Sequence, residues 1–156
     1  MKPRMKRKDL ETKDDVWNAV IGVISENDFP SESKEVNEAW VVFYYYSEME
    51  SGGHEILLNW LGDYIKEVGI QQYQAQLINV LEKIGAHDYA VIERTYLEPM
   101  WNLYVALEQD ETQEEDFISK VELADNEYHK ENRKLDTLLE RYFVKIHTEL
   151  IDVVED

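Results

Sequence analysis

The last third of the chain contains none of the residues that ordinarily end a helix. Residues 100–156 include neither proline nor glycine, the two residues least favourable in a helix interior. Near the end of this stretch, apolar side chains recur three or four positions apart, at Leu135, Leu138, Leu139, Tyr142, Phe143, Ile146 and Leu150. That spacing puts one apolar stripe along an amphipathic helix. The sequence therefore predicts that the chain ends in long helices that pack through one face.

The same spacing recurs upstream, between residues that favour helix ends. The apolar faces lie within residues 16–24, 36–47, 57–68 and 73–84. Glycine follows three of them, as Gly52-Gly53, Gly69 and Gly85, and glycine is common just after a helix. Pro99 suits the first turn of a helix, so we expect a short segment at 88–97 to stop before it. These patterns predict an all-α fold, a single compact domain of about seven to nine helices.

The segment from Trp40 to Tyr46 admits two interpretations. Its β-branched and aromatic residues are typical of a buried strand. A helical face nevertheless runs through it from Val36 to Phe43, and acidic helix formers flank it. We predict a helix and keep a strand as the alternative. The three consecutive tyrosines cannot all point inward from one helix, which indicates a tyrosine at the surface or in a homodimer contact.

Two capping boxes mark predicted helix starts. In this motif a Ser or Thr side chain bonds the backbone three residues on, and an acidic side chain there bonds back. Thr12 and Asp15 have this spacing, and so do Thr112 and Glu115. The second pair predicts a break, so that residues 108–111 close one helix and residues 114–116 open the next.

Charge is distributed unevenly along the chain. The formal net charge is −18, yet five of the 16 basic residues lie within the first eight positions. Residues 9–156 therefore carry 11 basic and 34 acidic residues, a net charge of −23. We expect residues 1–10 to form a mobile basic tail and residues 11–156 to form a single acidic helical domain. Such a domain repels nucleic acid and anionic membranes, so we expect it to bind neither of them directly and to attract basic proteins.

The sequence lacks the motifs of several functional classes. It has no cysteine, which excludes disulfides and thiolate metal sites. None of the four histidines follows an acid three positions earlier, as a di-iron Glu-x-x-His pair would need, and no phosphate-binding glycine loop or nucleophile elbow occurs. We therefore expect no metal, no cofactor and no catalytic residue, and predict that the protein is not an enzyme. No signal peptide or membrane-spanning run is recognisable, so a cytoplasmic location is expected.

The densest run of acids extends from Glu108 to Asp116, where six of nine residues are acidic and none is basic. Acids at a helix C-terminus are disfavoured by the helix dipole, so local stability does not explain those at 108–111. An unbroken helix would align Glu108, Glu111, Glu115, Glu122 and Asp125 in one row. The predicted partner-binding residues are Glu108, Asp110, Glu111, Glu114, Glu115 and Asp116, with a second patch at Glu48, Glu50 and Glu55. For any single one of them, a solvated face is the alternative.

Three motifs suggest a known family. They are Glu48-Met49-Glu50-Ser51-Gly52-Gly53, Val80-Leu81-Glu82-Lys83-Ile84-Gly85-Ala86, and Leu135-Asp136 leading to Tyr142-Phe143. With them, the chain from about Val36 onwards resembles a family of small acidic bacterial proteins classed as DNA mimics, otherwise a domain of unknown function. That family's first motif usually reads Asn-Gly-Gly followed by aromatic residues and an asparagine. Here Ser51 replaces the first asparagine, His54 an aromatic residue, and Leu57-Leu58 a Phe pair.

The resemblance implies an all-helical fold whose surface carboxylates imitate the phosphate rows of duplex DNA. The expected function is a non-enzymatic acidic protein that sequesters a basic DNA-binding protein, such as a transcription factor or nucleoid protein. The alternative is an immunity-type inhibitor that plugs the basic active site of a nuclease toxin. A third hypothesis is a helical scaffold or dimer whose charge serves solubility.

Overall fold

A computed structural model of the chain describes residues 2–131 and 134–155. Its seven α-helices are α1 (Lys13–Glu26), α2 (Lys34–Gly52), α3 (His54–Val68), α4 (Ile70–Lys83), α5 (His87–Leu107), α6 (Glu114–Lys130) and α7 (Lys134–Leu150). Two 3-10 turns, η1 (Arg7–Leu10) and η2 (Glu111–Gln113), and two short strands, β1 (Arg4–Lys6) and β2 (Asp152–Val154), complete the described part. The all-α prediction is confirmed. Within these residues no helix is both apolar and long enough for a membrane span.

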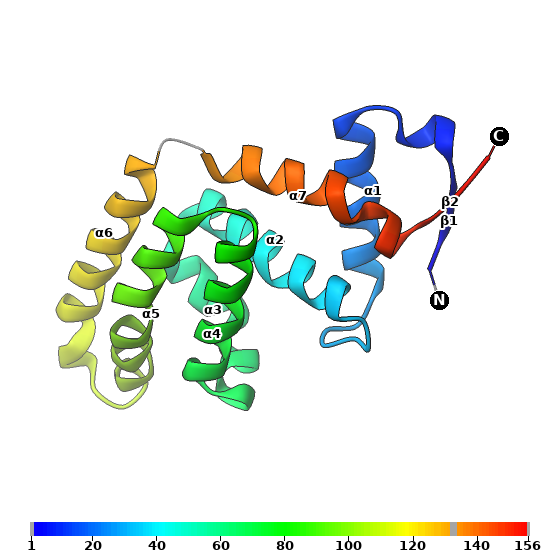
Figure 1. Cartoon of the computed structure of the whole chain (residues 1–156). Helices are drawn as coiled ribbons and strands as arrows, with labels where there is room; N and C mark the ends of the chain where they lie inside the picture. Colours follow the sequence, from blue (N-terminus) through cyan, green and yellow to red (C-terminus); the bar gives the residue numbers. More distant parts are fainter. Residues whose placement is uncertain (1, 132–133, 156) are drawn as a thin grey trace.

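Helix α2 is the element around which the others are arranged (Figure 1). It contacts α1 and α7 on one side of the molecule and α3 and α4 on the other. Its buried residues include Ala39, Val42, Tyr45 and Met49, which follow one another at helical spacing. The segment from Trp40 to Tyr46 is therefore helical, as predicted, and the strand alternative is wrong.

Glycines make the tight connections that the sequence predicts. Gly53, between α2 and α3, has φ +87°, and Gly69, between α3 and α4, has φ +91°. Both lie in the region that L-residues with a Cβ rarely adopt. The Gly69 N–H donates to the Ile65 carbonyl (2.7 Å), which closes α3 before α4 begins. Helices α2, α3 and α4 therefore follow one another with a single residue between neighbours.

Helix α5 does not stop before Pro99, and this part of the prediction is wrong. It runs unbroken through the proline, which is exposed. A proline in a helix interior costs about 3 kcal/mol because it removes one backbone hydrogen bond. The buried residues Leu97, Met100 and Trp101 lie on both sides of it. Burial of these large side chains offsets the cost of the missing bond.

The predicted break before α6 is confirmed, but its capping residue is not Thr112. Helix α6 begins at Glu114 after Gln113, and no side chain caps it. The carboxylate of Asp110 instead accepts from the Thr112 backbone N–H (3.0 Å) and hydroxyl (2.6 Å). Asp110 therefore caps the 3-10 turn η2, and Thr112 is its donor.

The N-terminal segment does not extend away from the domain as a basic tail. Strand β1 pairs in parallel with β2 at the other end of the chain, with Met5 opposite Val153 (Figure 1). The Arg7 guanidinium also contacts the Glu155 carboxylate at 3.0 Å. The physical reason is charge complementarity between a basic start and an acidic end, which the sequence cannot place side by side. Residue 1 lies outside the described residues.

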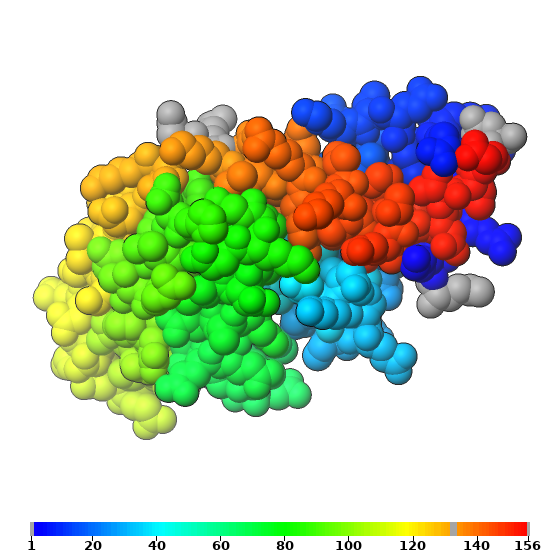
Figure 2. All heavy atoms as spheres, in the orientation of Figure 1, coloured from blue at the N-terminus to red at the C-terminus, as the bar shows by residue number. Residues whose placement is uncertain are grey.

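Helix α7 closes the fold over the helices that precede it. In the space-filling view this helix, in orange, lies against the green α4–α5 region (Figure 2). A Cβ at Gly85, between α4 and α5, would lie 3.8 Å from Leu138 of α7. The buried residues of α7 are Leu135, Leu139, Tyr142, Phe143, Ile146 and Leu150, six of the seven predicted for its apolar stripe.

We predict that Thr12→Ala destabilises the protein by about 1 kcal/mol. Thr12 accepts from the Asp15 N–H (3.0 Å), and Asp15 accepts from the Thr12 N–H (3.2 Å), so the substitution opens a formed capping box at the start of α1. Urea unfolding measures the loss. The matched control is Thr112→Ala, which removes a threonine that caps no α-helix and should cost less. An equal loss in both variants would contradict this assignment.

Candidate functional site

The six acids of the first predicted cluster all lie at the surface. Glu108 follows the end of α5, Asp110 and Glu111 begin η2, and Glu114, Glu115 and Asp116 form the first turn of α6. All six side chains are exposed. The cluster therefore forms the turn that joins the antiparallel helices α5 and α6.

Two members of this cluster have local structural roles. The Glu108 carboxylate accepts from Lys66 Nζ of α3 at 2.6 Å, which offsets its unfavourable place at a helix C-terminus. Asp110 caps η2, and hydrogen bonds from Thr112 and Gln113 lower the pKa of its carboxyl. Both acids therefore contribute to holding the α5–α6 turn in place.

The other four acids have no such contact in the described part of the chain. No basic side chain there lies within ion-pair distance of Glu111, Glu114, Glu115 or Asp116. Residues 114–116 lie at the positive end of the α6 dipole, which favours carboxylates by about 0.3–1 kcal/mol each. Their charge is accommodated locally and remains available to a partner.

The second predicted patch is divided by the fold. Glu55, in the first turn of α3, belongs to the same side of the molecule as Glu108. Burial, and after it the nearby carboxylates of Glu108, Asp63 and Glu55, raise the pKa of Tyr104, while Lys66 opposes them. We call Glu55, Asp63, Glu108 and the four acids at 111 and 114–116 the acidic face.

Glu50 lies elsewhere, because its carboxylate accepts from the Tyr128 hydroxyl (2.9 Å) near the end of α6. Helix α6 has 17 residues, so this end is about 24 Å from its start. Glu48 is half-buried in the last turns of α2. The structure therefore places Glu55 near Tyr104, as it does Glu108, and leaves Glu50 apart from them.

The unbroken row of acids considered for α6 does not form. Besides the break at η2, Asp125 turns inward and contacts His54. The outer surface of α6 carries the exposed residues Glu115, Ile118, Glu122 and Leu123. Apolar side chains therefore stand among the acids, a composition that differs from a purely solvated helix face.

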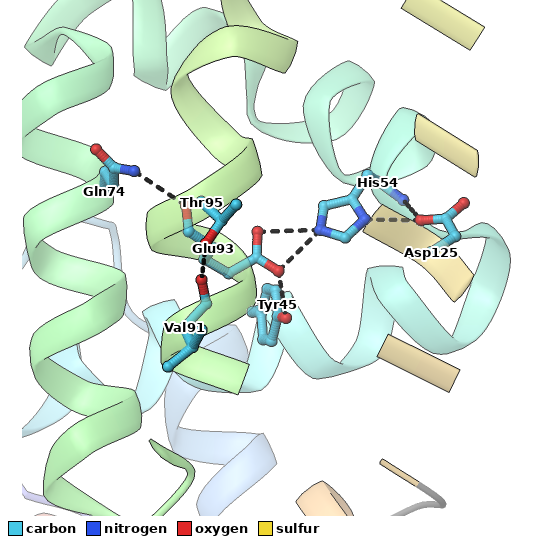
Figure 3. Close-up of polar contacts among 7 residues, drawn as sticks. All are labelled: Tyr45, His54, Gln74, Val91, Glu93, Thr95 and Asp125. Carbon is cyan, nitrogen blue, oxygen red and sulfur yellow. Dashed lines mark hydrogen bonds and ion pairs between the residues drawn. The ribbon is translucent and has the colours of Figure 1, made fainter. Parts of the chain in front are cut away.

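A buried polar network is the feature that the sequence analysis missed (Figure 3). His54 and Glu93 are both 0% exposed, and His54 Nε2 lies 2.8 Å from Glu93 Oε2. The Tyr45 hydroxyl donates to the same oxygen at 2.6 Å. On the other side of the ring, His54 Nδ1 lies 2.6 Å from Asp125 Oδ1. The four side chains come from α2, α3, α5 and α6, so the network connects four helices.

The glycine before His54 makes the contact with Asp125 possible. A Cβ at Gly53 would lie 2.4 Å from Asp125 Oδ2, so any larger residue there would collide with the carboxylate. The His54 backbone N–H lies in the first turn of α3 and so has no acceptor within the helix. It donates instead to Asp125 Oδ1 at 2.9 Å. Asp125 therefore caps α3 from a different helix.

The network holds a charged histidine. Burial alone lowers the pKa of His54, but the Glu93 carboxylate and the hydrogen bonds to Asp125 and Glu93 outweigh it and raise the pKa from 6.5 to about 9. The buried Glu93 carboxylate and the partly exposed Asp125 carboxylate therefore flank an imidazolium at neutral pH. Among residues 2–131 and 134–155 no group of three or more His, Asp or Glu side chains is arranged to hold a metal ion. Neither His54 nor Glu93 reaches solvent, so this pair connects helices and is not open to a ligand.

A sequence signal for this network existed. Glu93 lies four positions after Tyr89 and four before Leu97, and both neighbours are buried. An acid within an apolar stripe is almost never fully buried unless it has a partner. His54 likewise lies four positions before the buried Leu58. Neither the histidine spacing tested for metal sites nor the family motif that contains His54 indicates its pairing with Glu93.

The charged state of His54 predicts a pH dependence of stability. Because the folded pKa of about 9 exceeds 6.5, this contribution is fully present below pH 6.5 and is lost as pH rises to 9. We expect the free energy of unfolding to fall by up to about 3 kcal/mol across that window. Denaturant unfolding at several pH values measures it. In His54→Gln the fall should disappear, and in the control His129→Gln, an exposed histidine, it should persist. An unchanged slope in His54→Gln would refute the assignment.

Two buried tyrosines provide a matched test of the network. We predict that Tyr45→Phe destabilises the protein by about 1.5–3 kcal/mol, because its buried hydroxyl donates to the Glu93 carboxylate at 2.6 Å and the substitution leaves that bond unmade. Tyr73 is equally buried, and its hydroxyl has no hydrogen-bond partner among the described residues. Tyr73→Phe should therefore be neutral or stabilising in the same thermal and urea unfolding experiments. A comparable loss in both variants would mean that the Tyr45–Glu93 bond contributes nothing specific.

Comparison with known proteins gives one match. A family model described as DMP19-like protein matches residues 31–147, three quarters of the chain. The matched part extends from the loop before α2 into the last turn of α7 and contains the acidic face and the buried network. No curated protein and no solved structure matches the chain.

Proposed function

This chain belongs to the DMP19-like protein family, and we propose that it imitates duplex DNA and sequesters a basic DNA-binding protein. The partner class is a transcription factor or a nucleoid protein that is kept from its DNA while bound. In this proposal the protein acts by binding alone and catalyses no reaction. Family membership, the net charge of −18 and the acidic face support it together.

The observation that carries the proposal is the state of Glu111, Glu114, Glu115 and Asp116. These four carboxylates are exposed, lie within six consecutive residues, and have no basic partner within the described residues. Glu55, Asp63 and Glu108 extend the negative potential onto α3 and the end of α5. Such an array offers a protein partner a series of closely spaced negative charges, as the phosphates of DNA do.

The physical basis is the exchange of one polyanion for another. A DNA-binding surface carries Lys and Arg that neutralise phosphates, and each neutralised phosphate releases about 0.9 counterion from duplex DNA. A protein carboxylate array offers the same cations a fixed set of negative charges. The complex should therefore weaken steeply as salt rises, and duplex DNA should compete with it.

Affinity capture tests the proposal. The protein is immobilised, exposed to lysate of the organism that encodes it, and eluted either with a salt gradient or with duplex DNA. Recovery of a DNA-binding protein that duplex DNA displaces would support mimicry. A single nuclease that stays bound through high salt would contradict it and favour an immunity-type inhibitor. Recovery of no protein at low salt would also contradict it.

Charge reversal locates the site. We predict that Glu111→Lys with Glu115→Lys weakens the captured complex about tenfold or more at low salt, because repulsion replaces attraction at the contact. The control is Glu26→Lys with Asp28→Lys, two exposed acids near the end of α1 that give the same change in net charge. Binding is measured by titration calorimetry, and circular dichroism checks the helices. Equal losses in both variants would mean that only total charge matters.

A further inference from the structure

A series of aromatic rings in contact connects the α1–α2 loop to the surface of α3. The rings of Phe29 and Trp40 are parallel, with centroids 3.8 Å apart and planes 4° apart. Trp40 then packs against Trp60 at 5.5 Å. Tyr44, one turn beyond Trp40 on α2, stacks on Trp60 at 4.5 Å and 18°. We call Phe29, Trp40, Tyr44 and Trp60 the aromatic shelf.

The outer ring of this shelf is open to solvent. Trp60 is 48% exposed, although it is the kind of side chain that dominates protein cores. Ile56, one turn earlier on α3, is exposed as well. The Tyr44 ring stacks on the indole of Trp60, and the Trp40 ring packs against it with planes 36° apart, so the two rings hold the indole in one orientation. An exposed indole that is held in place by neighbouring rings is suited to an interaction surface.

Acidic side chains border the shelf on both helices. Asp63 and Glu67 are exposed and lie three and seven positions after Trp60, on the same outward stripe of α3. Glu48 lies four positions after Tyr44 on α2. The Cβ atoms of residues three or four positions apart on a helix lie about 5–6 Å from each other. The nearest lysine on α3, Lys66, is paired with Glu108. A cation can interact with both features, because it is attracted to the face of the indole and can form an ion pair with a carboxylate.

We infer that the aromatic shelf binds arginine side chains of the basic partner, with the guanidinium stacked on Trp60 and paired with Asp63 or Glu67. The planar guanidinium stacks on aromatic rings and is weakly hydrated, whereas a lysine ammonium is a strongly hydrated point charge. A second copy of this chain is disfavoured as the occupant, because two surfaces of chains with net charge −18 would repel each other. The inference rests on the proposed function in requiring a basic partner, and it assigns arginine recognition to a surface distinct from the α5–α6 turn.

Two peptides of equal charge test the inference on the full-length protein. One repeats Arg-Gly and the other Lys-Gly, and fluorescence anisotropy of the labelled peptides gives both affinities. We expect the arginine peptide to bind about two- to fivefold more tightly for each guanidinium that stacks. Trp60→Leu should abolish this preference and leave the lysine peptide unaffected. The control Val91→Ala, at an apolar residue of α5 that is 54% exposed, should change neither affinity.

A second variant guards against a packing effect of Trp60→Leu. Asp63→Asn with Glu67→Gln leaves the rings untouched and should weaken both peptides. Equal binding of the two peptides, or a preference that persists in Trp60→Leu, would overturn the inference and leave the proposed function standing. Failure of both peptides to bind would overturn both. Dimerisation in analytical ultracentrifugation that Trp60→Leu abolishes would show that a second copy covers the shelf, and would overturn the inference alone.

Discussion

The packing of four helices depends on one buried ion pair. His54 of α3 and Glu93 of α5 are 39 residues apart in sequence and meet in the interior, where Tyr45 of α2 and Asp125 of α6 complete their hydrogen bonds. A buried charge without a partner costs several kcal/mol, so each member requires the others. Apolar stripes let helices slide or rotate at modest cost, whereas this network accepts one arrangement. It therefore sets how α6, and the acids it carries, lies against α3.

Local rules predict most of the helices, and tertiary contacts explain the failures. The capping box at Thr12, the glycine after each of α2 and α3, and the break before α6 act within a few residues, so the sequence alone reveals them. At Pro99 the local rule fails because the burial of apolar side chains on both sides of the proline stabilises α5. At Thr112 it fails because Asp110 provides the cap and Thr112 is its donor. The pairing of β1 with β2 joins the two ends of the chain, and no local pattern encodes it.

For the candidate acidic site, too, the sequence predicts one part and the fold determines the rest. Composition identifies the cluster at 108–116, but only the fold separates its members by role: Glu108 pairs with Lys66, Asp110 caps a turn, and the rest face solvent. The fold also brings Glu55 to this side and turns Asp125 away from it. The stacking of Trp60 on Tyr44 likewise could not be predicted from the sequence, because it depends on how α2 and α3 cross.

The pairing of β1 with β2 has a practical consequence for work with this protein. The two strands lie at one end of the molecule, and α6 lies at the opposite end (Figure 1). A tag, dye or surface anchor attached at either terminus therefore emerges far from the acidic face and leaves it accessible. Because the two strands are parallel, the chain enters β1 and leaves β2 at opposite ends of the pair, so tags at the two termini would point in different directions (Figure 1).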